Sequence, residues 1–297
     1  MIRLNLEQLR TFVIVVRSGG VVRAAQSLNL TQPAVTARIK ALEDTLGTAL
    51  FDRGKGAGKL TKRGEMLLQH ARKLEVLSNQ IERDIVEPTG VEGTLRIGAS
   101  ETIAQSWLPE FVAALYATFP NLQIELNVDV SVNLRNALLA REIDLAFLLG
   151  PVSEYSVDNV QLPVFELGWY ASAATAQSQE VAASLFGKPV ITYAKNTRPF
   201  RELEAKIGQW IGPDVPFFPS SSLSAAMRLV ASGLGVSALP RSLAEPRVAE
   251  GELVRFDPGW LPDPLSFTAS YVADPPSQTT ERAAKIALEI SQDWPQT

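Results

Sequence analysis

The sequence predicts an α/β protein with an N-terminal winged helix-turn-helix, a long linker helix and a two-lobed α/β domain. Three observations predict this fold class. Three short helical patterns separated by tight turns occupy residues 5–47, a heptad-spaced apolar pattern covers residues 62–86, and strands alternate with helices from residue 93 onward. A chain of 297 residues, 46% hydrophobic and 20% charged, is long enough for two or three such domains.

The charge is unevenly distributed along the chain. Residues 1–62 carry ten Lys and Arg against four Asp and Glu (net +6), residues 63–87 carry four against five (net −1), and residues 88–297 carry 14 against 23 (net −9). A basic segment joined to an acidic body is typical of a polyanion-binding module beside a module that does not bind polyanions. Chance clustering of solvated charge is the alternative.

Composition excludes several classes of site. The chain has no Cys, which excludes disulfides, thiolate nucleophiles and Cys-ligated metals, and His70 is its one histidine. We therefore expect no catalytic residues, no metal and no cofactor. No signal peptide and no run of 18 apolar residues is found, so we expect a cytoplasmic protein that does not contact the membrane.

Capping residues set the bounds of the three N-terminal helices. Asn5 can N-cap a first helix that ends near Ser18, and a second helix covers residues 21–28. Thr31 can N-cap a third helix with Pro33 in its first turn, and this helix runs to about residue 46 before Gly47.

The third helix has two different faces. Its apolar stripe, which must be buried, consists of Val35, Ile39, Leu42 and Leu46. The opposite face carries short or polar side chains that fit a DNA major groove, namely Gln32, Pro33, Thr36, Ala37 and Lys40. A plain helical bundle would give the same spacing and stays open at this point.

A flexible basic loop follows the third helix. Residues 49–60 predict a short pair of strands around a glycine-rich tip, a wing whose cations Arg53, Lys55 and Lys59 can approach phosphates. A phosphate-binding P-loop is excluded by spacing, because Arg53 stands where its first Gly is required and Leu60 separates Lys59 from Thr61.

Thr61 can cap a long helix that spans about residues 62–86. Leu67, Leu74 and Ile81 repeat every seven residues, and Leu77 extends the same apolar stripe. Pairing with the same helix of a second chain would cover this stripe and make a homodimer. Packing against its own chain is the alternative, and either arrangement places His70 on or beside the seam rather than in a ligand set.

Alternating strands and helices predict two lobes in the remainder. The order βαβαβ predicts a parallel sheet over residues 94–147, and a second such unit is expected over residues 165–239, before the chain recrosses at 265–271 and ends in a helix at 278–292. We expect domains at 1–61, 62–90 and 91–297. The first lobe would comprise about 91–163 and 267–297, and the second about 164–266.

Polar residues follow the predicted strands. In open parallel sheets ligands lie beyond the carboxyl ends of strands. That rule selects Ser100, Glu101, Thr102, Ser131, residues 196–200 and residues 220–222, Ser221 among them. Hydroxyls at helix starts favour a small anion, whereas Glu101 argues against a simple carboxylate. Taken singly, each Ser or Thr can be an ordinary helix cap.

Residues 6–64 resemble the LysR-type transcriptional regulators in many positions in order. The resemblance is carried by Leu9, Phe12, Ala24, Ala25, Leu28, the run Thr31-Gln32-Pro33-Ala34-Val35-Thr36, Ile39, Leu42, Glu43, Leu46, Gly47, the run Leu50-Phe51-Asp52-Arg53 and the run Leu60-Thr61-Lys62-Arg63-Gly64. It implies a homo-oligomer, commonly a tetramer, that binds double-stranded DNA. It also implies a periplasmic-binding-protein-like effector domain that senses a small molecule, and RNA polymerase as a further partner.

The resemblance also assigns residues. It implies that Gln32, Pro33, Thr36 and Ala37 face the DNA groove, that Arg53 contacts the DNA backbone, and that Ser100, Ser131, Thr197 and Phe200 line the effector pocket. The chain departs from the family at Gly20 and Val22, where hydroxyl residues are usual, and at Ala37, often an arginine in relatives. Arg38 turns toward the core edge, so we expect it to contact phosphate.

Two other classes of protein are the alternatives to a regulator. A solute-binding protein shares the two-lobed architecture but needs an export signal. An enzyme is suggested only by Glu142 and Asp144, which are alternate residues near a strand start and are more simply read as capping and solvated groups.

Overall fold

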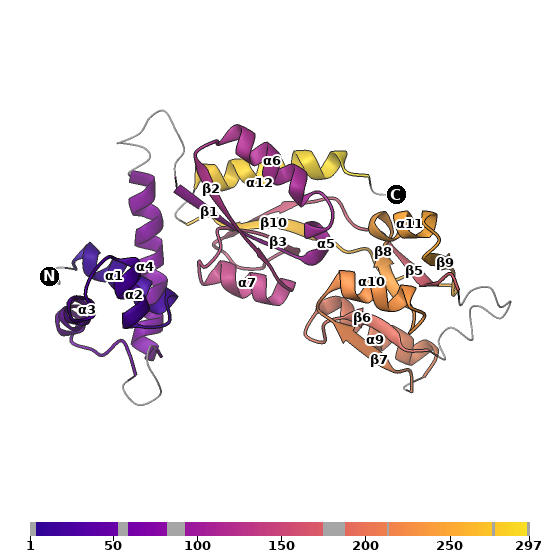
Figure 1. Ribbon diagram of the computed structural model, residues 1–297, viewed down its shortest axis with the longest axis horizontal. Coiled ribbons are helices and arrows are strands. Elements are labelled where there is room, and N and C mark those ends of the chain that lie inside the picture. Colours follow the sequence, from indigo (N-terminus) through magenta and orange to yellow (C-terminus); the bar gives the residue numbers. More distant parts are fainter. Residues whose placement is uncertain are drawn as a thin grey trace. The chain divides into compact units, whose positions relative to one another are not determined.

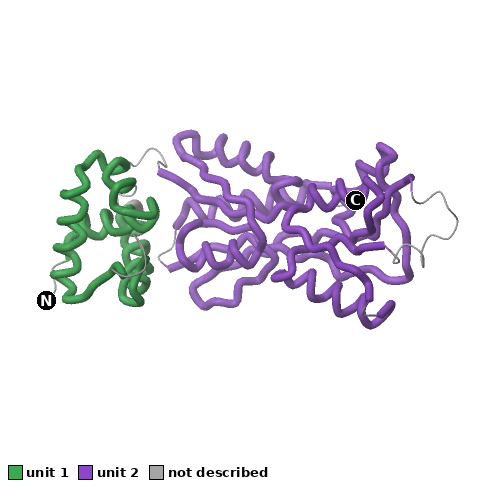
Figure 2. Tube along the Cα trace, turned by 60° about the horizontal axis from the view of Figure 1, so that its bottom comes forward, with its two compact units in different colours: residues 1–89 green, residues 90–297 purple. Residues whose placement is uncertain are grey.

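The computed structural model describes residues 4–52, 59–81, 93–174, 188–212, 214–274 and 277–295. The chain divides into two compact units, residues 1–89 and residues 90–297 (Figure 2). Each unit has its own hydrophobic core and is described by itself.

The first unit opens with three helices whose caps come from local sequence. Helix α1 spans Leu6–Arg17, α2 spans Val21–Ser27 and α3 spans Gln32–Leu46. The Asn5 side chain accepts a hydrogen bond from the amide of Glu7, and Thr31 Oγ1 accepts one from the amide of Ala34. Gly47 ends α3 in the left-handed conformation, with φ of 66°, which glycine adopts without steric cost. These bounds agree with the predicted ones to within one residue.

The core of this unit lies where α1, α2 and α3 meet. Phe12, Val35 and Leu42 have no exposed surface, and the Phe12 ring packs edge-on against Phe51 with centroids 5.5 Å apart. Residues 51 and 60 form one antiparallel bridge, which is where the sequence predicts a pair of strands.

Helix α4 spans Lys62–Ile81 and begins against this core. Thr61 Oγ1 accepts a hydrogen bond from the amide of Gly64, at 3.0 Å, which caps the helix as predicted. A Cβ added to Gly64 would lie 2.2 Å from the carbonyl oxygen of Leu50, so only glycine lets the two backbones approach this closely.

A five-stranded sheet forms the first lobe of the second unit. It contains β1 (Gly93–Ala99), β2 (Leu122–Val128), β3 (Leu145–Leu149), β4 (Val157–Gln161) and β10 (Phe267–Val272) in the order β2-β1-β3-β10-β4. The strands β2, β1 and β3 are parallel, as predicted, while β10 runs antiparallel to both β3 and β4. The mixed sheet arises because β10 returns from the second lobe, and sequence analysis did not anticipate β4.

Helices cover both faces of this sheet (Figure 1). Helices α6 (Leu108–Thr118) and α12 (Gln278–Asp293) pack together on one face, and α7 (Ser131–Leu139) packs on the other. Successive side chains of β3 point to opposite faces of the sheet, and both faces are buried. Leu145 and Phe147 belong to the core under α6 and α12, and Ala146 and Leu148 belong to the core under α7. A single helical turn, α5 (Glu101–Ala104), follows β1.

The second lobe contains two small sheets. Strands β5 (Leu167–Ser172), β8 (Ser237–Pro240) and β9 (Leu253–Phe256) are antiparallel in the order β8-β5-β9, and β6 (Val190–Tyr193) is parallel to β7 (Phe217–Ser220). Its described part also contains helices α9 (Arg198–Trp210), α10 (Leu223–Ala231) and α11 (Arg241–Ala249). The expectation of a second parallel unit was therefore wrong for β5. Strands β6 and β7 are joined by a helical crossover, through α9, and that connection is what a parallel pair requires.

Two chain segments cross between the lobes side by side. Phe165 and Leu265 form an antiparallel bridge, each amide donating to the other's carbonyl at 3.0 and 2.9 Å. Both side chains are buried. The two crossings predicted from sequence are thus hydrogen-bonded to each other, and the two lobes lie on opposite sides of this pair of segments.

Candidate functional site

One face of α3 is exposed and the other is buried. Gln32, Pro33, Thr36, Ala37 and Lys40 are all exposed, as predicted. Val35, Ile39 and Leu42 are buried in the core, and Leu46 is half-buried. Thr36 Oγ1 donates a hydrogen bond to the Gln32 carbonyl, at 3.0 Å, so the side chain presents its methyl group and its acceptor lone pairs outward. The outward face therefore offers an amide, a methyl, a hydroxyl acceptor and one ammonium group.

Arg38 lies beside this face but has partners within the same unit. Its Nη1 lies 3.4 Å from Glu7 Oε2 and 3.3 Å from Thr11 Oγ1, both on α1. The side chains of Arg38 and Glu7 are 36% and 63% exposed, so this ion pair is solvated and adds little stability. The contact still directs the guanidinium toward α1, which separates Arg38 from the Lys40 ammonium.

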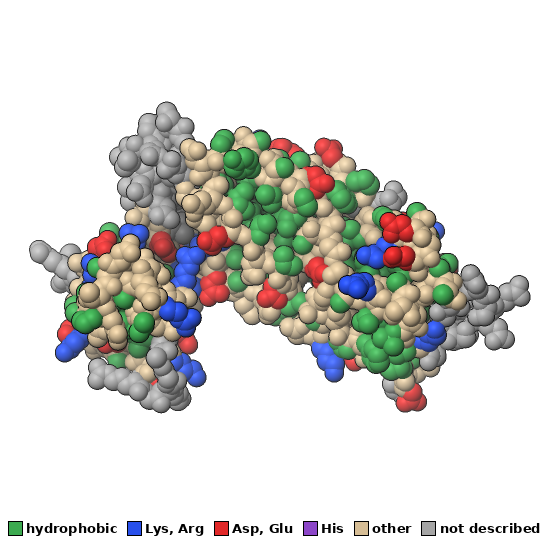
Figure 3. Space-filling view, viewed as in Figure 1, with side chains coloured by type: hydrophobic (Ala, Val, Ile, Leu, Met, Phe, Trp, Pro, Cys, Tyr) green, Lys and Arg blue, Asp and Glu red, His purple; other side chains and the backbone are tan. Residues whose placement is uncertain are grey.

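The basic wing is described only in part. Arg53 and Lys55 lie outside the described residues. Lys59 is exposed, and its carbonyl accepts a hydrogen bond from the amide of Asp52, at 2.8 Å, next to the bridge between residues 51 and 60. Figure 3 shows Lys and Arg side chains on the visible face of the first unit.

Part of the apolar stripe of α4 packs on the core of its own unit, and part of it stays exposed. Leu67 is half-buried and packs on the core of its own unit, beside the buried Ala71. We expected Leu67 to face a second chain, but it packs on its own unit instead. The reason is that Leu67 lies on the same side of α4 as Gly64 and Ala71, and this side contacts the core. Leu74 and Leu77 remain 37% and 43% exposed.

Two further points concern the exposed side of α4. Met66, which sequence analysis missed, is 59% exposed and lies on the same side of the helix as Leu77, eleven residues later. His70 is exposed, and the side chain of Ile81 lies outside what the structure describes.

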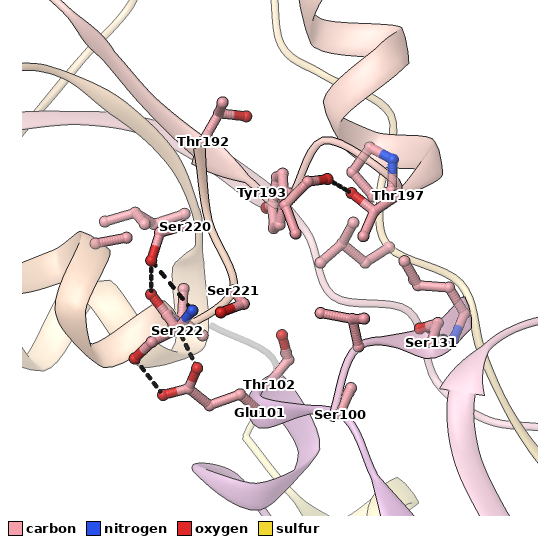
Figure 4. Close-up of a pocket in the computed structure, with 18 of the residues that line it drawn as sticks. Ser100, Glu101, Thr102, Ser131, Thr192, Tyr193, Thr197, Ser220, Ser221 and Ser222 are labelled. Carbon is pink, nitrogen blue, oxygen red and sulfur yellow. Dashed lines mark hydrogen bonds between the residues drawn. The ribbon is translucent and has the colours of Figure 1, made fainter. Parts of the chain in front are cut away.

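A cavity of about 660 Å³, part of it open to solvent, lies between the two lobes of the second unit. Residues at the carboxyl ends of β1, β2 and β3 line it from the first lobe, and residues after β6 and β7 line it from the second lobe (Figure 4). Leu265 and Phe267, from the crossing segment and the start of β10, also line it. Its position at the carboxyl ends of parallel strands is where ligands commonly bind in open α/β sheets.

Six of the seven residues predicted for this site line the cavity. They are Ser100, Glu101, Thr102, Ser131, Thr197 and Ser221. Phe200 differs from the prediction: it is 4% exposed and packs edge-on against Phe217, with centroids 6.0 Å apart. The physical reason is helical spacing, because Phe200 shares the buried stripe of α9 with Leu203 and Ile207.

Other lining residues were missed by sequence analysis. Thr192 and Tyr193 end β6, so the strand-end rule could have selected them, and Asp129 stands just before α7 at the end of β2. The strand-end rule could not select Ser237, because this residue begins β8 rather than following a strand, and the antiparallel pairing of β8 with β5 was not predicted.

Most polar side chains in the cavity have hydrogen-bond partners inside the protein. Ser131 Oγ accepts from the amide of Leu149, at 2.9 Å, and Thr197 Oγ1 donates to the carbonyl of Ala194, at 2.7 Å. Tyr193 Oη donates to the carbonyl of Ala238, at 3.2 Å, and burial raises the pKa of this phenol, so it stays neutral.

Two hydroxyls in the cavity differ from these. Ser100 and Thr192 are 8% and 4% exposed, and within the described part of the chain neither hydroxyl oxygen has a hydrogen-bond partner. Buried hydroxyls normally have a partner, so these two mark places where a bound molecule can donate or accept.

Glu101 reaches from the first lobe to the start of α10 in the second. Its carboxylate accepts a hydrogen bond from Ser222 Oγ at 3.2 Å (Figure 4). It also accepts from the amide of Ser224 at 3.1 Å, from Ser224 Oγ at 2.7 Å and from the amide of Leu223. Burial alone would raise the pKa of this carboxyl, but the hydrogen bonds from Ser224, Leu223 and Ser222 outweigh burial and lower it. Glu101 is therefore ionised at neutral pH.

The described residues offer no metal site and no membrane-spanning helix. No cluster of three or more His, Asp or Glu side chains that could hold a metal ion occurs there. No described helix is both long and apolar enough to cross a membrane.

Comparison with known proteins identifies both units. Residues 6–65 match the family model described as bacterial regulatory helix-turn-helix protein, lysR family, and residues 88–294 match the LysR substrate binding domain. The chain is 33% identical over 260 residues to the HTH-type transcriptional regulator YusT of Bacillus subtilis (strain 168), covering 87% of this chain and 85% of that protein.

Solved structures agree in fold. Full-length LysG from Corynebacterium glutamicum, with bound effector Arg, superposes with a TM-score of 0.70 at 19% identity, covering 98% of this chain and 99% of LysG. Full-length CbnR complexed with its target DNA superposes with a TM-score of 0.62 at 20% identity, covering 97% and 100%. The matched family and the named relatives are transcriptional regulators, not enzymes. The chain is a member of the LysR family of transcriptional regulators.

Proposed function

We propose that this regulator reads a specific sequence of duplex DNA with the outward face of α3, and that a small-molecule effector binds in the cavity between the lobes. The observation that carries the proposal is the two-sided α3, in which an apolar stripe is locked into the core while Gln32, Thr36 and Lys40 stay exposed.

The groups on α3 suit major-groove recognition. The Gln32 amide can donate and accept, as adenine requires, the Thr36 methyl can contact a thymine methyl, and Lys40 can reach a phosphate or guanine. The N-terminal turn of α3 and the exposed Lys59 add backbone contacts that position the helix. The solved complex of CbnR with its target DNA supports this use of the fold.

We infer that two chains pair through the exposed side of α4, around Leu74, Leu77 and Met66. A monomer would leave these three apolar side chains in water. Pairing two identical helices would also place two α3 helices on one duplex. Assembly of dimers into tetramers, action in the cytoplasm and contact with RNA polymerase belong to the same proposal and follow from the family.

The cavity supports an effector by its position and its lining. It lies beside the paired crossing segments, so a molecule bound there contacts both lobes and can change their relative orientation. The bound effector Arg in full-length LysG supports a sensory role for this domain in the fold.

A ligand screen tests the effector proposal. We would screen metabolites for compounds that raise the melting temperature of the full-length protein, since a ligand that binds only the folded state must stabilise it. The exposed Ser221 lines the cavity, so Ser221→Trp should fill part of the site and abolish the shift. Ser153→Trp is the matched control, because Ser153 is also exposed and does not line the cavity. A shift that survives Ser221→Trp would place the ligand elsewhere and contradict the proposal.

A further inference from the structure

We propose that Glu101 is a built-in occupant of the anion-binding position at the start of α10, so that the cavity selects uncharged polar effectors and rejects carboxylates and phosphates. This inference rests on the proposed function, since it names the chemical class of the effector that the cavity would take.

The first-turn donors of α10 are already satisfied. A helix start attracts anions because its first amides lack partners within the helix. Here the amides of Leu223 and Ser224 both donate to Glu101, and the amide of Ala225 donates to Ser222 Oγ, at 3.2 Å. An external anion would have to displace a carboxylate that is held by the chain itself.

Glu101 is also held from its own side. Gln105 Nε2 donates to its carboxylate at 3.0 Å, one turn later in the first lobe. The carboxylate therefore joins the first lobe to three successive residues of the second, Ser222, Leu223 and Ser224. This is the arrangement that an effector carboxylate would make if Glu101 were absent.

The charges around the cavity oppose a second anion. None of the described residues that line it is Lys, Arg or His. Its charged lining residues are Glu101 and Asp129, and Asp129 Oδ1 accepts from the amide of Val130 at 2.7 Å and from Asn133 Nδ2 at 2.9 Å. A carboxylate or phosphate entering this cavity would lose its hydration and meet two like charges without a cation to balance it.

The remaining polar groups indicate an uncharged ligand. The hydroxyls of Ser100 and Thr192 are the two buried side-chain groups in the described lining that have no partner. Around them lie apolar side chains such as Leu149, Leu265 and Phe267. A partly apolar molecule with a hydroxyl, carbonyl or amide group would pair these hydroxyls and fill the space between the lobes.

Acetate rescue tests the role of Glu101. Glu101→Ala frees the amides of Leu223 and Ser224, so acetate should bind there and raise the melting temperature of this variant relative to chloride at the same cation concentration, by about 2–4 °C. The wild type should gain only the smaller increase that acetate gives folded proteins in general. Glu110→Ala is the control, because Glu110 is an exposed carboxylate on α6 of the same lobe. If Glu101→Ala folds poorly in chloride, refolding yield in acetate serves as the readout.

Two results would overturn the inference. One is a wild type that gains as much from acetate as Glu101→Ala does, and the other is a Glu101→Ala variant that gains nothing. The effector screen provides an independent test: a carboxylate or phosphate that binds the wild type, and is blocked by Ser221→Trp, refutes the proposed ligand class while leaving the proposed function standing. A screen in which no shift depends on Ser221 counts against the proposed function, and the acetate comparison still decides what Glu101 does.

Discussion

Lys40→Ala should reduce the salt dependence of DNA binding, because it removes an exposed ammonium group from the face of α3 that we assign to DNA. Lys40 is exposed on the outward face of α3, one turn beyond Thr36. Each phosphate neutralised by a cation contributes about 0.9 to the slope of log affinity against log salt. A dimer presents two copies of Lys40, so Lys40→Ala should lower the magnitude of the slope by about 1.8.

Arg38 provides the matched control in the same helix. Its guanidinium lies within 3.4 Å of Glu7 and 3.3 Å of Thr11, so Arg38→Ala should change the slope less than Lys40→Ala does. The assay is fluorescence anisotropy of a labelled duplex titrated with full-length protein over a series of potassium chloride concentrations. An unchanged slope for Lys40→Ala, or a larger loss for Arg38→Ala, would refute the assignment of this face.

Three further predictions concern stability, assembly and pH. Gly64→Ala should lower the free energy of unfolding by about 1–3 kcal/mol in chemical denaturation, because its Cβ would lie 2.2 Å from a backbone oxygen. Gly208→Ala within α9 is the control and should raise the free energy of unfolding by about 0.5–1 kcal/mol, because its Cβ would meet nothing within 4 Å. Leu74→Glu with Leu77→Glu should weaken the dimer by about 4 kcal/mol, roughly 1 kcal/mol for each of the four apolar side chains, and sedimentation at micromolar concentration should then show monomers. The stability difference between wild type and Glu101→Gln should be full at neutral pH and should disappear as pH falls through the folded-state pKa, below the ordinary value of 4.5, because a lowered carboxyl pKa stabilises the fold only while the group is ionised. A difference that persists in acid would show that hydrogen bonding rather than charge is responsible.

Local sequence was sufficient to predict the three N-terminal helices and the start of α4. Asn5, Thr31, Gly47 and Thr61 act on backbone groups within three residues of themselves, and the structure has the helix bounds at the positions that they indicate. The apolar stripe of α3 was predicted for the same reason, since helical spacing alone decides which side chains share a face.

The features that the sequence did not reveal depend on contacts between distant segments. Glu101 meets Ser224 across 123 positions of the chain, and no local pattern indicates that pairing. The antiparallel neighbours of β5, strands β8 and β9, likewise come from much later in the chain within the same lobe. Leu67 fits the heptad pattern as well as Leu74 does, and only the packing of α4 on α1 separates the two.

Selection of binding sites from random duplex DNA tests the central claim most directly. The wild type and the double variant Gln32→Ala, Thr36→Ala would be selected in parallel at one salt concentration. The outward face of α3 carries the sequence preference in this account, so the double variant should enrich a different or weaker motif while its salt slope stays close to that of the wild type. Enrichment of the same motif by both proteins would mean that another surface reads the bases.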